Sequence, residues 1–258
     1  MESDPIVVPA LSERDVEYFK RDGYVVVRGL FGAARMRAIR AGVDELQSWP
    51  EAPGKYMMYF EESLTDRRRI LSRVENFCPY HRALNDLVMS GEMLGAASQL
   101  FGEPGVLFKD KINFKMSGGD GFKAHQDVQA GWDTYASLHI TAMVSIDRTT
   151  HENGCLEMAP GQHRRGLIGK AWEPLGEREL SAMKYVSCPT EPGDAVFFDS
   201  FIPHRSAPNL TADQRRVLYI TYNRASEGDH LARYYADKRK SYPPDCEREP
   251  GKQYVFRV

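Results

Sequence analysis

The sequence predicts a mainly β fold with helices, namely a double-stranded β-helix (a jelly-roll or cupin-like barrel) preceded by an N-terminal helical layer. The order of the elements favours this fold. Helical patterns dominate residues 1–104, and short strand patterns separated by Gly, Pro, Asn and Asp occupy residues 105–225. A chain of 258 residues can form one large core, and no repeat, low-complexity tract or long linker divides it. We therefore expect a single domain over residues 1–258 that ends in a C-terminal segment, residues 226–258.

The N-terminal elements are predicted from caps and apolar spacing. An N-cap pattern at Ser12 predicts a helix that ends at Gly23. The β-branched run 24–28 predicts a short strand, and apolar residues at helical spacing predict a helix over residues 33–49. One or two further helices are expected between residues 85 and 101.

Residues 55–60 are apolar and aromatic but follow neither the helical nor the strand period. Two interpretations remain open for this segment. It is either a buried connector or a loop whose Met and Tyr side chains close over a ligand pocket.

The later part of the chain reads as a series of strands. Residues 106–116 form the first, and further strands are expected at 155–158, 195–198 and 215–222. Residues 137–147 alternate between an apolar face and a mostly polar face. One face of this strand can pack into the core while the other lines a cavity.

The composition is that of an ordinary globular protein, with 42% hydrophobic and 27% charged residues and a net charge of −2. This charge gives no basic field for nucleic acid or an anionic membrane, and no run of about 18 apolar residues is long enough to span a bilayer. The acidic start, residues 1–5, lacks the order of a signal peptide, and the four cysteines are scattered without a Cys-x-x-Cys pair. We expect a cytoplasmic protein with reduced thiols and neither nucleic-acid nor membrane partners.

A candidate metal site begins at His125 and Asp127. Side chains two residues apart on an extended strand point to the same side, so both can reach one ion. His204, in a second strand-like segment, can supply a third ligand. Two imidazoles and one carboxylate with open positions are the ligand set of non-haem Fe(II) oxygenases. A His-x-Asp pattern also occurs by chance, so spacing alone leaves open that these histidines only form hydrogen bonds.

An oxygenase of this kind takes electrons from a 2-oxo acid, whose distal carboxylate needs a fixed cation. Arg215 and Arg216 follow His204 on the next strand, and strand alternation turns one inward and the other outward. The spacing does not say which arginine points inward. His139, on the polar face of the alternating strand, is placed either to contact a substrate or to form a hydrogen bond within the wall.

Several motifs in order resemble the phytanoyl-CoA dioxygenase family of Fe(II)/2-oxoglutarate oxygenases over nearly the whole chain. Residues 19–31 are similar to the opening helix and strand of that family, and 125–127 match its first two iron ligands. Residues 153–156 and 160–163 resemble its barrel turn, and 192–194 resemble the turn before its third ligand. Together these motifs are far more specific than His-x-Asp alone.

The resemblance implies Fe(II) and 2-oxoglutarate as cofactor and co-substrate. It implies that His125, Asp127 and His204 bind the iron. It also implies that Arg215 and Asn113 hold 2-oxoglutarate, and that no catalytic residue is needed beyond the metal ligands.

The resemblance also suggests substrate contacts. Lys109 takes the place of a substrate-contacting glutamine in the ectoine hydroxylase branch, which suggests an anionic substrate, although a solvated lysine is equally compatible with the sequence. Gln126, His139 and Tyr135 are further candidate contacts, and Tyr135 is suited to face an amine. The C-terminal run 229–245 is similar to members that hydroxylate small phosphonates such as 2-aminoethylphosphonate.

The implied function is hydroxylation of a C–H bond in a small polar substrate, with 2-oxoglutarate and O₂ consumed and succinate and CO₂ released. The substrate expected from the resemblance is an aminoalkylphosphonate, attacked at its alpha carbon in phosphonate catabolism. Asp127 favours hydroxylation, because halogenating relatives lack this carboxylate. The alternatives are the same chemistry on an amino-acid-like or other small metabolite, a non-catalytic metal- or ligand-binding barrel, and a zinc hydrolase.

Overall fold

The computed structural model describes residues 11–254, so the acidic start of the chain lies outside the described residues. The helices are α1 (Glu13–Asp22), α2 (Ala33–Gln47), α3 (Arg82–Val88), α4 (Ala96–Phe101), α5 (Glu177–Ser181) and α6 (Leu231–Ser241). The strands are β1 (Tyr24–Val27), β2 (Met57–Glu62), β3 (Arg69–Glu75), β4 (Gly105–Lys115), β5 (Phe122–His125), β6 (His139–Ser145), β7 (Leu156–Met158), β8 (Val186–Cys188), β9 (Ala195–Asp199), β10 (His204–Ser206) and β11 (Arg215–Arg224).

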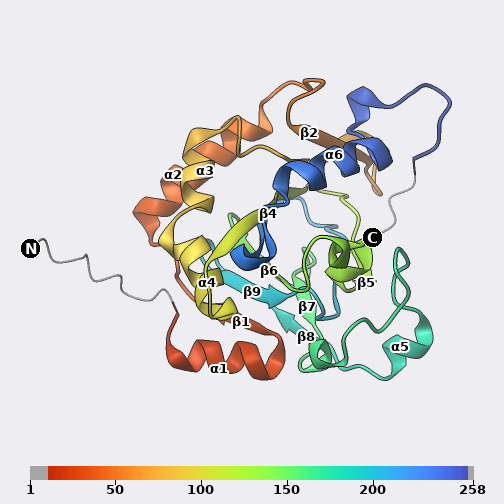
Figure 1. Cartoon of the computed structure of the whole chain (residues 1–258). Coiled ribbons are helices and arrows are strands. Elements are labelled where there is room, and N and C mark those ends of the chain that lie inside the picture. The colour runs from red at the N-terminus through yellow and green to blue at the C-terminus, as the bar shows by residue number, and fades with distance from the viewer. Residues whose placement is uncertain (1–10, 255–258) are drawn as a thin grey trace, which may run out of the picture.

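These strands form two antiparallel sheets (Figure 1). The major sheet has seven strands in the order β1-β9-β6-β11-β4-β3-β2, and the minor sheet has four in the order β5-β10-β7-β8. An apolar cluster joins the sheets, with Met143 and Val217 from the major sheet against Leu156 and Met158 from the minor one. The predicted mainly β fold is confirmed, although the two sheets pack face to face and are not closed into a barrel.

Helices α1 to α4 cover the outer face of the major sheet, and α2, α3 and α4 lie together on one side of it in Figure 1. The largest apolar cluster fills this layer and takes Ile140, Ala142 and Val144 from β6. The intervening residue Met143 joins the cluster between the sheets, and Thr141 lines a cavity there. The predicted two-faced character of this strand is therefore confirmed.

The capped first helix is also confirmed. The Ser12 hydroxyl accepts a hydrogen bond from the Asp15 amide at 3.2 Å, and the Asp15 carboxylate accepts one from the Ser12 amide at 2.9 Å. The helix ends at Gly23, whose φ of 83° favours glycine. The region between residues 85 and 101 contains parts of two α-helices, α3 and α4, separated by the wider turn η1 (Gly91–Gly95).

Residues 55–60 form neither a connector nor a loop, although Tyr59 and Phe60 do line a cavity of about 510 Å³. Most of them belong to β2, which pairs with β3 at the edge of the major sheet. The strand period is hidden because both of its faces are buried. Met57 and Tyr59 join an apolar cluster beneath α6, while Met58 joins the main core. Strands β2 and β3 thus extend the major sheet beside β4, whose side chains line the functional site.

Strand β4 lies between β11 and β3 in the major sheet and brings polar side chains to its inner face. Lys109, Lys111, Asn113 and Lys115 alternate with the apolar residues Ile112 and Phe114, which enter the outer core. Helix α6 packs on this strand and crosses it in Figure 1. The inner face of β4 is therefore a row of polar groups enclosed between the sheets and α6.

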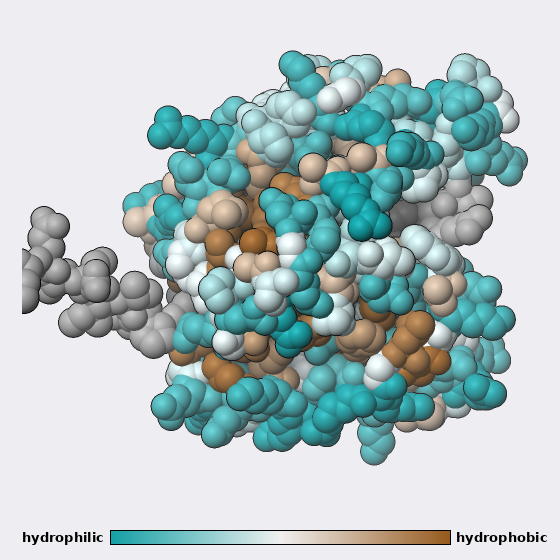
Figure 2. Space-filling view, in the orientation of Figure 1, coloured by the Kyte–Doolittle hydropathy of each residue, from teal (hydrophilic) through white to brown (hydrophobic). Residues whose placement is uncertain are grey.

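The face of the molecule in Figure 2 is mainly hydrophilic, with hydrophobic residues visible only in small groups between the polar ones. No helix within residues 11–254 combines the length and apolar character needed to cross a membrane.

Candidate metal centre

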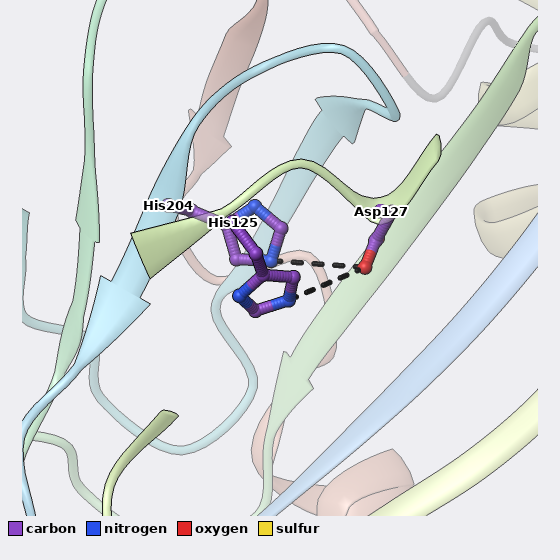
Figure 3. Close-up of side chains that lie close together, drawn as sticks. All are labelled: His125, Asp127 and His204. Carbon is purple, nitrogen blue, oxygen red and sulfur yellow. Dashed lines mark ion pairs between the residues drawn. The ribbon is translucent and has the colours of Figure 1, made fainter. Parts of the chain in front are cut away.

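His125, Asp127 and His204 lie together between the two sheets (Figure 3). Pairing of β5 with β10 places His204 directly opposite His125, and Asp127 follows β5 at the start of the 3₁₀ turn η2 (Asp127–Ala130). The His125 and His204 Nε2 atoms lie 3.7 and 3.8 Å from Asp127 Oδ1. One ligand atom from each residue falls within 4.8 Å of the others, which is close enough for all three to hold one metal ion.

Backbone contacts favour the histidine tautomer that a metal requires. His125 Nδ1 lies 2.7 Å from the Lys123 carbonyl oxygen, and His204 Nδ1 lies 3.0 Å from that of Ile202. A carbonyl can only accept, so each Nδ1 carries the proton and each Nε2 presents a lone pair toward Asp127. Burial, assisted by the neighbouring His204, lowers the pKa of His125 to about 3, which keeps this imidazole neutral.

The Asp127 carboxylate is held in its ionised form. Burial alone would raise its pKa, but His204, His125 and two nearby lysines hold the pKa of Asp127 below its ordinary value. Asp127 Oδ1 faces the imidazoles, while Oδ2 receives a long hydrogen bond of 3.4 Å from Thr141. Two imidazoles that present Nε2 and an ionised carboxylate fit a divalent first-row metal ion.

A cavity of about 30 Å³ adjoins this triad, which is room for about two water molecules. Two larger cavities flank it. One of about 610 Å³ shares Lys109 with the small cavity, and one of about 510 Å³ shares Phe122 and His125. The triad is thus enclosed, and its neighbouring cavities have the size of ligand sites.

The structure distinguishes the two candidate arginines. Arg216 points to the outer layer, where it pairs with Asp147 at 2.8 Å and Asp44 at 2.5 Å. Arg215 pairs in register with Lys115 on the inner face and is only 1% exposed. The inward residue is Arg215.

The Arg215 guanidinium is a buried cation whose hydrogen bonds are unmet. The Tyr219 hydroxyl lies close enough to interact with it, but none of its three nitrogens completes a hydrogen bond of good geometry within the described residues. Burial lowers the pKa of Arg215, and no carboxylate of residues 11–254 forms an ion pair with it. The buried amide oxygen of Asn113 also lacks a partner. The unmet guanidinium donors fit an anionic ligand such as the distal carboxylate of 2-oxoglutarate, whereas the Asn113 oxygen can only accept a hydrogen bond and calls for a donor.

The candidate substrate residues fall in different places. Lys109 lines the small cavity beside the triad, and Tyr135 lines the 610 Å³ cavity, where its hydroxyl donates to Asp237 at 2.9 Å. His139 is 1% exposed and packs against the rings of Phe108 and Trp132, outside the lining of these cavities. Burial lowers the pKa of His139 to about 4.

Gln126 turns away from the triad and is completely buried. Its amide nitrogen donates to the carbonyl oxygens of Gly166 and Phe201 at 2.8 and 2.6 Å, and its amide oxygen accepts from the Ile168 amide at 2.8 Å. With these backbone partners, Gln126 positions the segment after residue 165 instead of contacting a substrate, because strand alternation sends it to the opposite side from His125 and Asp127.

Two residues that the sequence reasoning missed lie near the triad. Lys111 lines the small cavity, and Glu75 pairs with Lys111 across β3 and β4. The alternation of Lys109, Lys111 and Asn113 was visible in the sequence and could have identified Lys111. No pattern in the sequence singles out Glu75, since its position depends on the pairing of an unpredicted strand.

Comparison with known proteins agrees with this geometry. A family model described as phytanoyl-CoA dioxygenase (PhyH) matches residues 19–217. The chain is 43% identical over 239 residues to a 2-aminoethylphosphonate dioxygenase from an uncultured bacterium (HF130_AEPn_1), covering 92% of this chain and 90% of that protein. It is 37% identical over 233 residues to a methylphosphonate hydroxylase from Gimesia maris, covering 90% of this chain and 88% of that protein.

Among solved structures, EctD from S. alaskensis with 2-oxoglutarate and 5-hydroxyectoine superposes with a TM-score of 0.74 at 21% identity. The match covers 88% of this chain and 80% of that one. At this identity the likeness establishes the fold, and it confirms the predicted jelly-roll architecture.

Proposed function

The chain belongs to the phytanoyl-CoA dioxygenase family and is an Fe(II)/2-oxoglutarate-dependent dioxygenase, and we propose that it hydroxylates the alpha carbon of an aminoalkylphosphonate such as 2-aminoethylphosphonate. The observation that carries this proposal is the 43% identity to a 2-aminoethylphosphonate dioxygenase over nearly the full length of both proteins. Lys109 supports it, since a buried cation beside the triad suits an anionic headgroup.

We assign the iron to His125, Asp127 and His204, whose three ligand atoms leave one side open to the cavity. Arg215, with its unmet hydrogen-bond donors, and Asn113, through its amide NH2 group, are the proposed contacts of 2-oxoglutarate. When bound, these groups supply the oxidation in which one atom of O₂ enters a substrate C–H bond as hydroxyl and the other enters succinate, with loss of CO₂.

The contribution of the chain is to orient and enclose the reactants. The Lys123 and Ile202 carbonyls fix the two imidazole rings by accepting their Nδ1 protons. Thr141 restrains the second oxygen of Asp127 and is itself 2.9 Å from the Thr221 hydroxyl. The small volume beside the triad limits the water that can reach the reacting carbon. No side chain is required as a general acid or base.

The proposed substrate lies with its phosphonate toward Lys109 and its amine toward the 610 Å³ cavity. Lys109 lines both spaces, so one small molecule can reach from the triad into the larger cavity. Tyr135 and Asp237 line that cavity and present a ring and a half-exposed carboxylate, both of which attract an ammonium group. We retain a cytoplasmic location as part of this proposal.

The proposal is tested by measuring succinate formation from 2-oxoglutarate, with Fe(II) and O₂, in the presence of candidate substrates. The panel contains phosphonates, amino acids, cyclic amino acids and acyl-CoA thioesters. We expect 2-aminoethylphosphonate to give the highest coupled turnover, and Asp127→Ala to lose it. Preferred turnover of a CoA ester or an amino acid would refute the phosphonate assignment, and full activity of Asp127→Ala would refute the proposed iron ligands.

A further inference from the structure

Two lysines of β4 enter the same small space as the triad. Lys109 and Lys111 are two residues apart on the inner face of the strand, so their side chains point to the same side. Both line the 30 Å³ cavity together with His125, Asp127 and His204. Arg205 is the only other basic residue besides these lysines and the two histidines in that lining, and its guanidinium is 2.9 Å from Glu157.

Aromatic rings hold both ammonium groups without using their hydrogen bonds. Lys109 Nζ lies 5.2 and 5.5 Å from the ring centres of Trp132 and Tyr234. Lys111 Nζ lies 4.7 Å from the ring centre of Tyr219. Within residues 11–254, neither Nζ makes a hydrogen bond or an ion pair with a side chain. Cation–π contact orients an ammonium group but leaves its three N–H donors available.

The carboxylate of Glu75, near both lysines, already accepts hydrogen bonds from other residues. Glu75 is completely buried and receives hydrogen bonds from Arg73 on one oxygen and from Lys238 of α6 on the other. Burial alone would raise its pKa, but Lys238, Lys109, Arg73 and Lys111 together hold the pKa of Glu75 below its ordinary value. One carboxylate therefore balances the charge of four basic side chains, with Asp127 as the next acidic group in reach.

The positive charges of Lys109 and Lys111 are electrostatically unfavourable in this buried space. Burial and the proximity of Lys109 lower the pKa of Lys111 to about 7. Buried charges are normally paired, so an anion that entered the cavity would remove an electrostatic cost that the chain itself leaves uncompensated.

We propose that Lys109 and Lys111 together form a receptor for a dianionic tetrahedral headgroup, the phosphonate of the substrate, and that Glu75, itself held by Arg73 and Lys238, lies opposite Lys111 and keeps the pair in place by charge attraction. The proposal rests on the proposed function and adds to it a second cation and a supporting ion network. Tetrahedral dianions offer several acceptor oxygens, which two ammonium groups two residues apart can share.

The position of the receptor agrees with attack on the carbon bonded to phosphorus. That carbon is one bond from the headgroup, so the headgroup must be bound beside the metal ligands and not at a distance. Both lysines meet this requirement, because they line the triad's own cavity. Arg215 is the anion site assigned to 2-oxoglutarate. Its strand partner Lys115 lies roughly 20 Å from Lys109 and roughly 13 Å from Lys111 along β4 at about 3.3 Å per residue, and Tyr219 contacts both Arg215 and Lys111.

The test compares Lys109→Met and Lys111→Met with Lys184→Met, an exposed lysine outside the cavities. Calorimetry measures the Kd of 2-aminoethylphosphonate for the enzyme loaded with Fe(II) and 2-oxoglutarate in the absence of O₂. We expect each receptor variant to weaken binding by about 10- to 100-fold, while the Kd of 2-oxoglutarate changes by less than about twofold. Unchanged phosphonate affinity in both variants, or an equal loss of 2-oxoglutarate affinity, would overturn the receptor.

A second comparison concerns charge. At about pH 8 a phosphonate is mostly a dianion, whereas 2-aminoethanesulfonate has a headgroup of similar shape with one charge. We expect the wild type to prefer the phosphonate by about 10-fold or more, and both Met variants to lose most of this preference. Equal affinity of the wild type for the two compounds would contradict a two-lysine receptor.

Two further variants separate the receptor from folding and from the overall reaction. Lys109→Arg and Lys111→Arg keep the charge and should restore part of the phosphonate affinity, even where the Met variants are less stable on thermal unfolding.

If the wild type turns over 2-aminoethylphosphonate but the variants bind it normally, the receptor is wrong and the proposed function stands. If the wild type neither binds nor oxidises any phosphonate, the proposed function is wrong and the receptor falls with it.

Discussion

At the scale of single residues, Arg215 and Arg216 show how neighbouring cations can have opposite roles. Arg216 is paired with Asp147 and Asp44, whereas the Arg215 guanidinium is buried with unmet hydrogen bonds. An uncompensated buried charge destabilises a fold, and a ligand that pairs with it restores the lost free energy. If Arg215 binds 2-oxoglutarate as proposed, its unpaired charge lowers the stability of the free protein and the co-substrate restores it.

This effect gives the first prediction. Without 2-oxoglutarate, Arg215→Met should raise the free energy of unfolding by about 1–3 kcal/mol, because an apolar side chain of similar length replaces an unpaired cation. 2-Oxoglutarate should raise the Tm of the wild type but not that of the variant. Thermal unfolding with and without the co-substrate measures both effects.

Arg216→Met is the matched control. It breaks a partly buried ion network and should lower the free energy of unfolding by about 2 kcal/mol, while the Tm still responds to 2-oxoglutarate. A 2-oxoglutarate-dependent shift that survives in Arg215→Met would contradict the assignment of Arg215.

The second prediction at this scale concerns pH. Burial raises the pKa of Asp199 to about 6, above the value of about 3.9 expected in the unfolded chain. The folded state then binds the proton more tightly, so this group's contribution to stability is lost as pH rises from about 4 to about 6. Asn can still accept the hydrogen bond that Asp199 takes from the Phe201 amide at 2.7 Å.

Asp199→Asn should therefore be more stable than the wild type by about 1–3 kcal/mol at about pH 8, with a smaller difference near pH 5. Urea unfolding at both pH values measures the change. A stability difference that does not vary with pH would show that Asp199 keeps an ordinary pKa.

Residue spacing was sufficient to predict the triad but not which arginine points inward, for which only the family resemblance favoured Arg215. Strand geometry placed His125 and Asp127 on one side, and His204 followed from a second strand-like segment, although Asp127 lies just after β5, in η2. The choice between Arg215 and Arg216 depends on the register of β11 against β4, which is a long-range property. Glu75 was missed for the same reason, since its pairing with Lys111 exists only after β3 joins the sheet.

At the scale of elements, the segment from residue 166 to 175 is held by two glutamines beside the metal ligands. Gln126 bonds the backbone at Gly166 and Ile168, and Gln129 donates to the carbonyls of Lys170 and Glu173 at 2.7 and 2.6 Å. Trp172 of this segment lines both larger cavities. The glutamines therefore connect the triad's own turn to a wall of the cavities.

The third prediction follows from these contacts. Gln126→Leu should lower the free energy of unfolding by about 1–3 kcal/mol, because it leaves three partly buried backbone groups without partners. Amide hydrogen exchange should become faster in residues 166–175, while the outer helices change little. Gln162→Leu, which removes only a contact with Arg165 in a surface turn, is the control. Unchanged exchange in residues 166–175 would contradict the role of Gln126.

Elements with one buried face were predictable, and elements with two buried faces were not. The alternation in β6 identified both its core face and its cavity face. In β2, Met57 and Met58 are both completely or nearly buried, on opposite sides, so the strand period disappeared. The sequence of that segment therefore predicts that it is buried but does not predict whether it is a helix or a strand.

At the scale of the whole molecule, the order of helices and strands was enough to predict the jelly-roll fold, because few architectures accept that order. The strand neighbours were not predictable, since β1 pairs with β9 and β3 pairs with β4 across long stretches of chain. These pairings and those of the minor sheet bring the His-Asp-His triad, Arg215 and the two lysines of β4 into one interior. Substrate selection depends on the size and the charge of the cavities that these pairings enclose.

The most direct test of the account is the position and source of the new hydroxyl group. The purified enzyme receives Fe(II), 2-oxoglutarate, ¹⁸O₂ and 2-aminoethylphosphonate with deuterium only on the carbon bonded to phosphorus, and the product is analysed by mass spectrometry and ³¹P NMR. We predict a 1-hydroxy product that has gained one ¹⁸O and lost one deuterium, with succinate formed in equal amount. A product that retains both deuterium atoms, or no succinate above the substrate-free level, would contradict alpha-carbon hydroxylation by this enzyme.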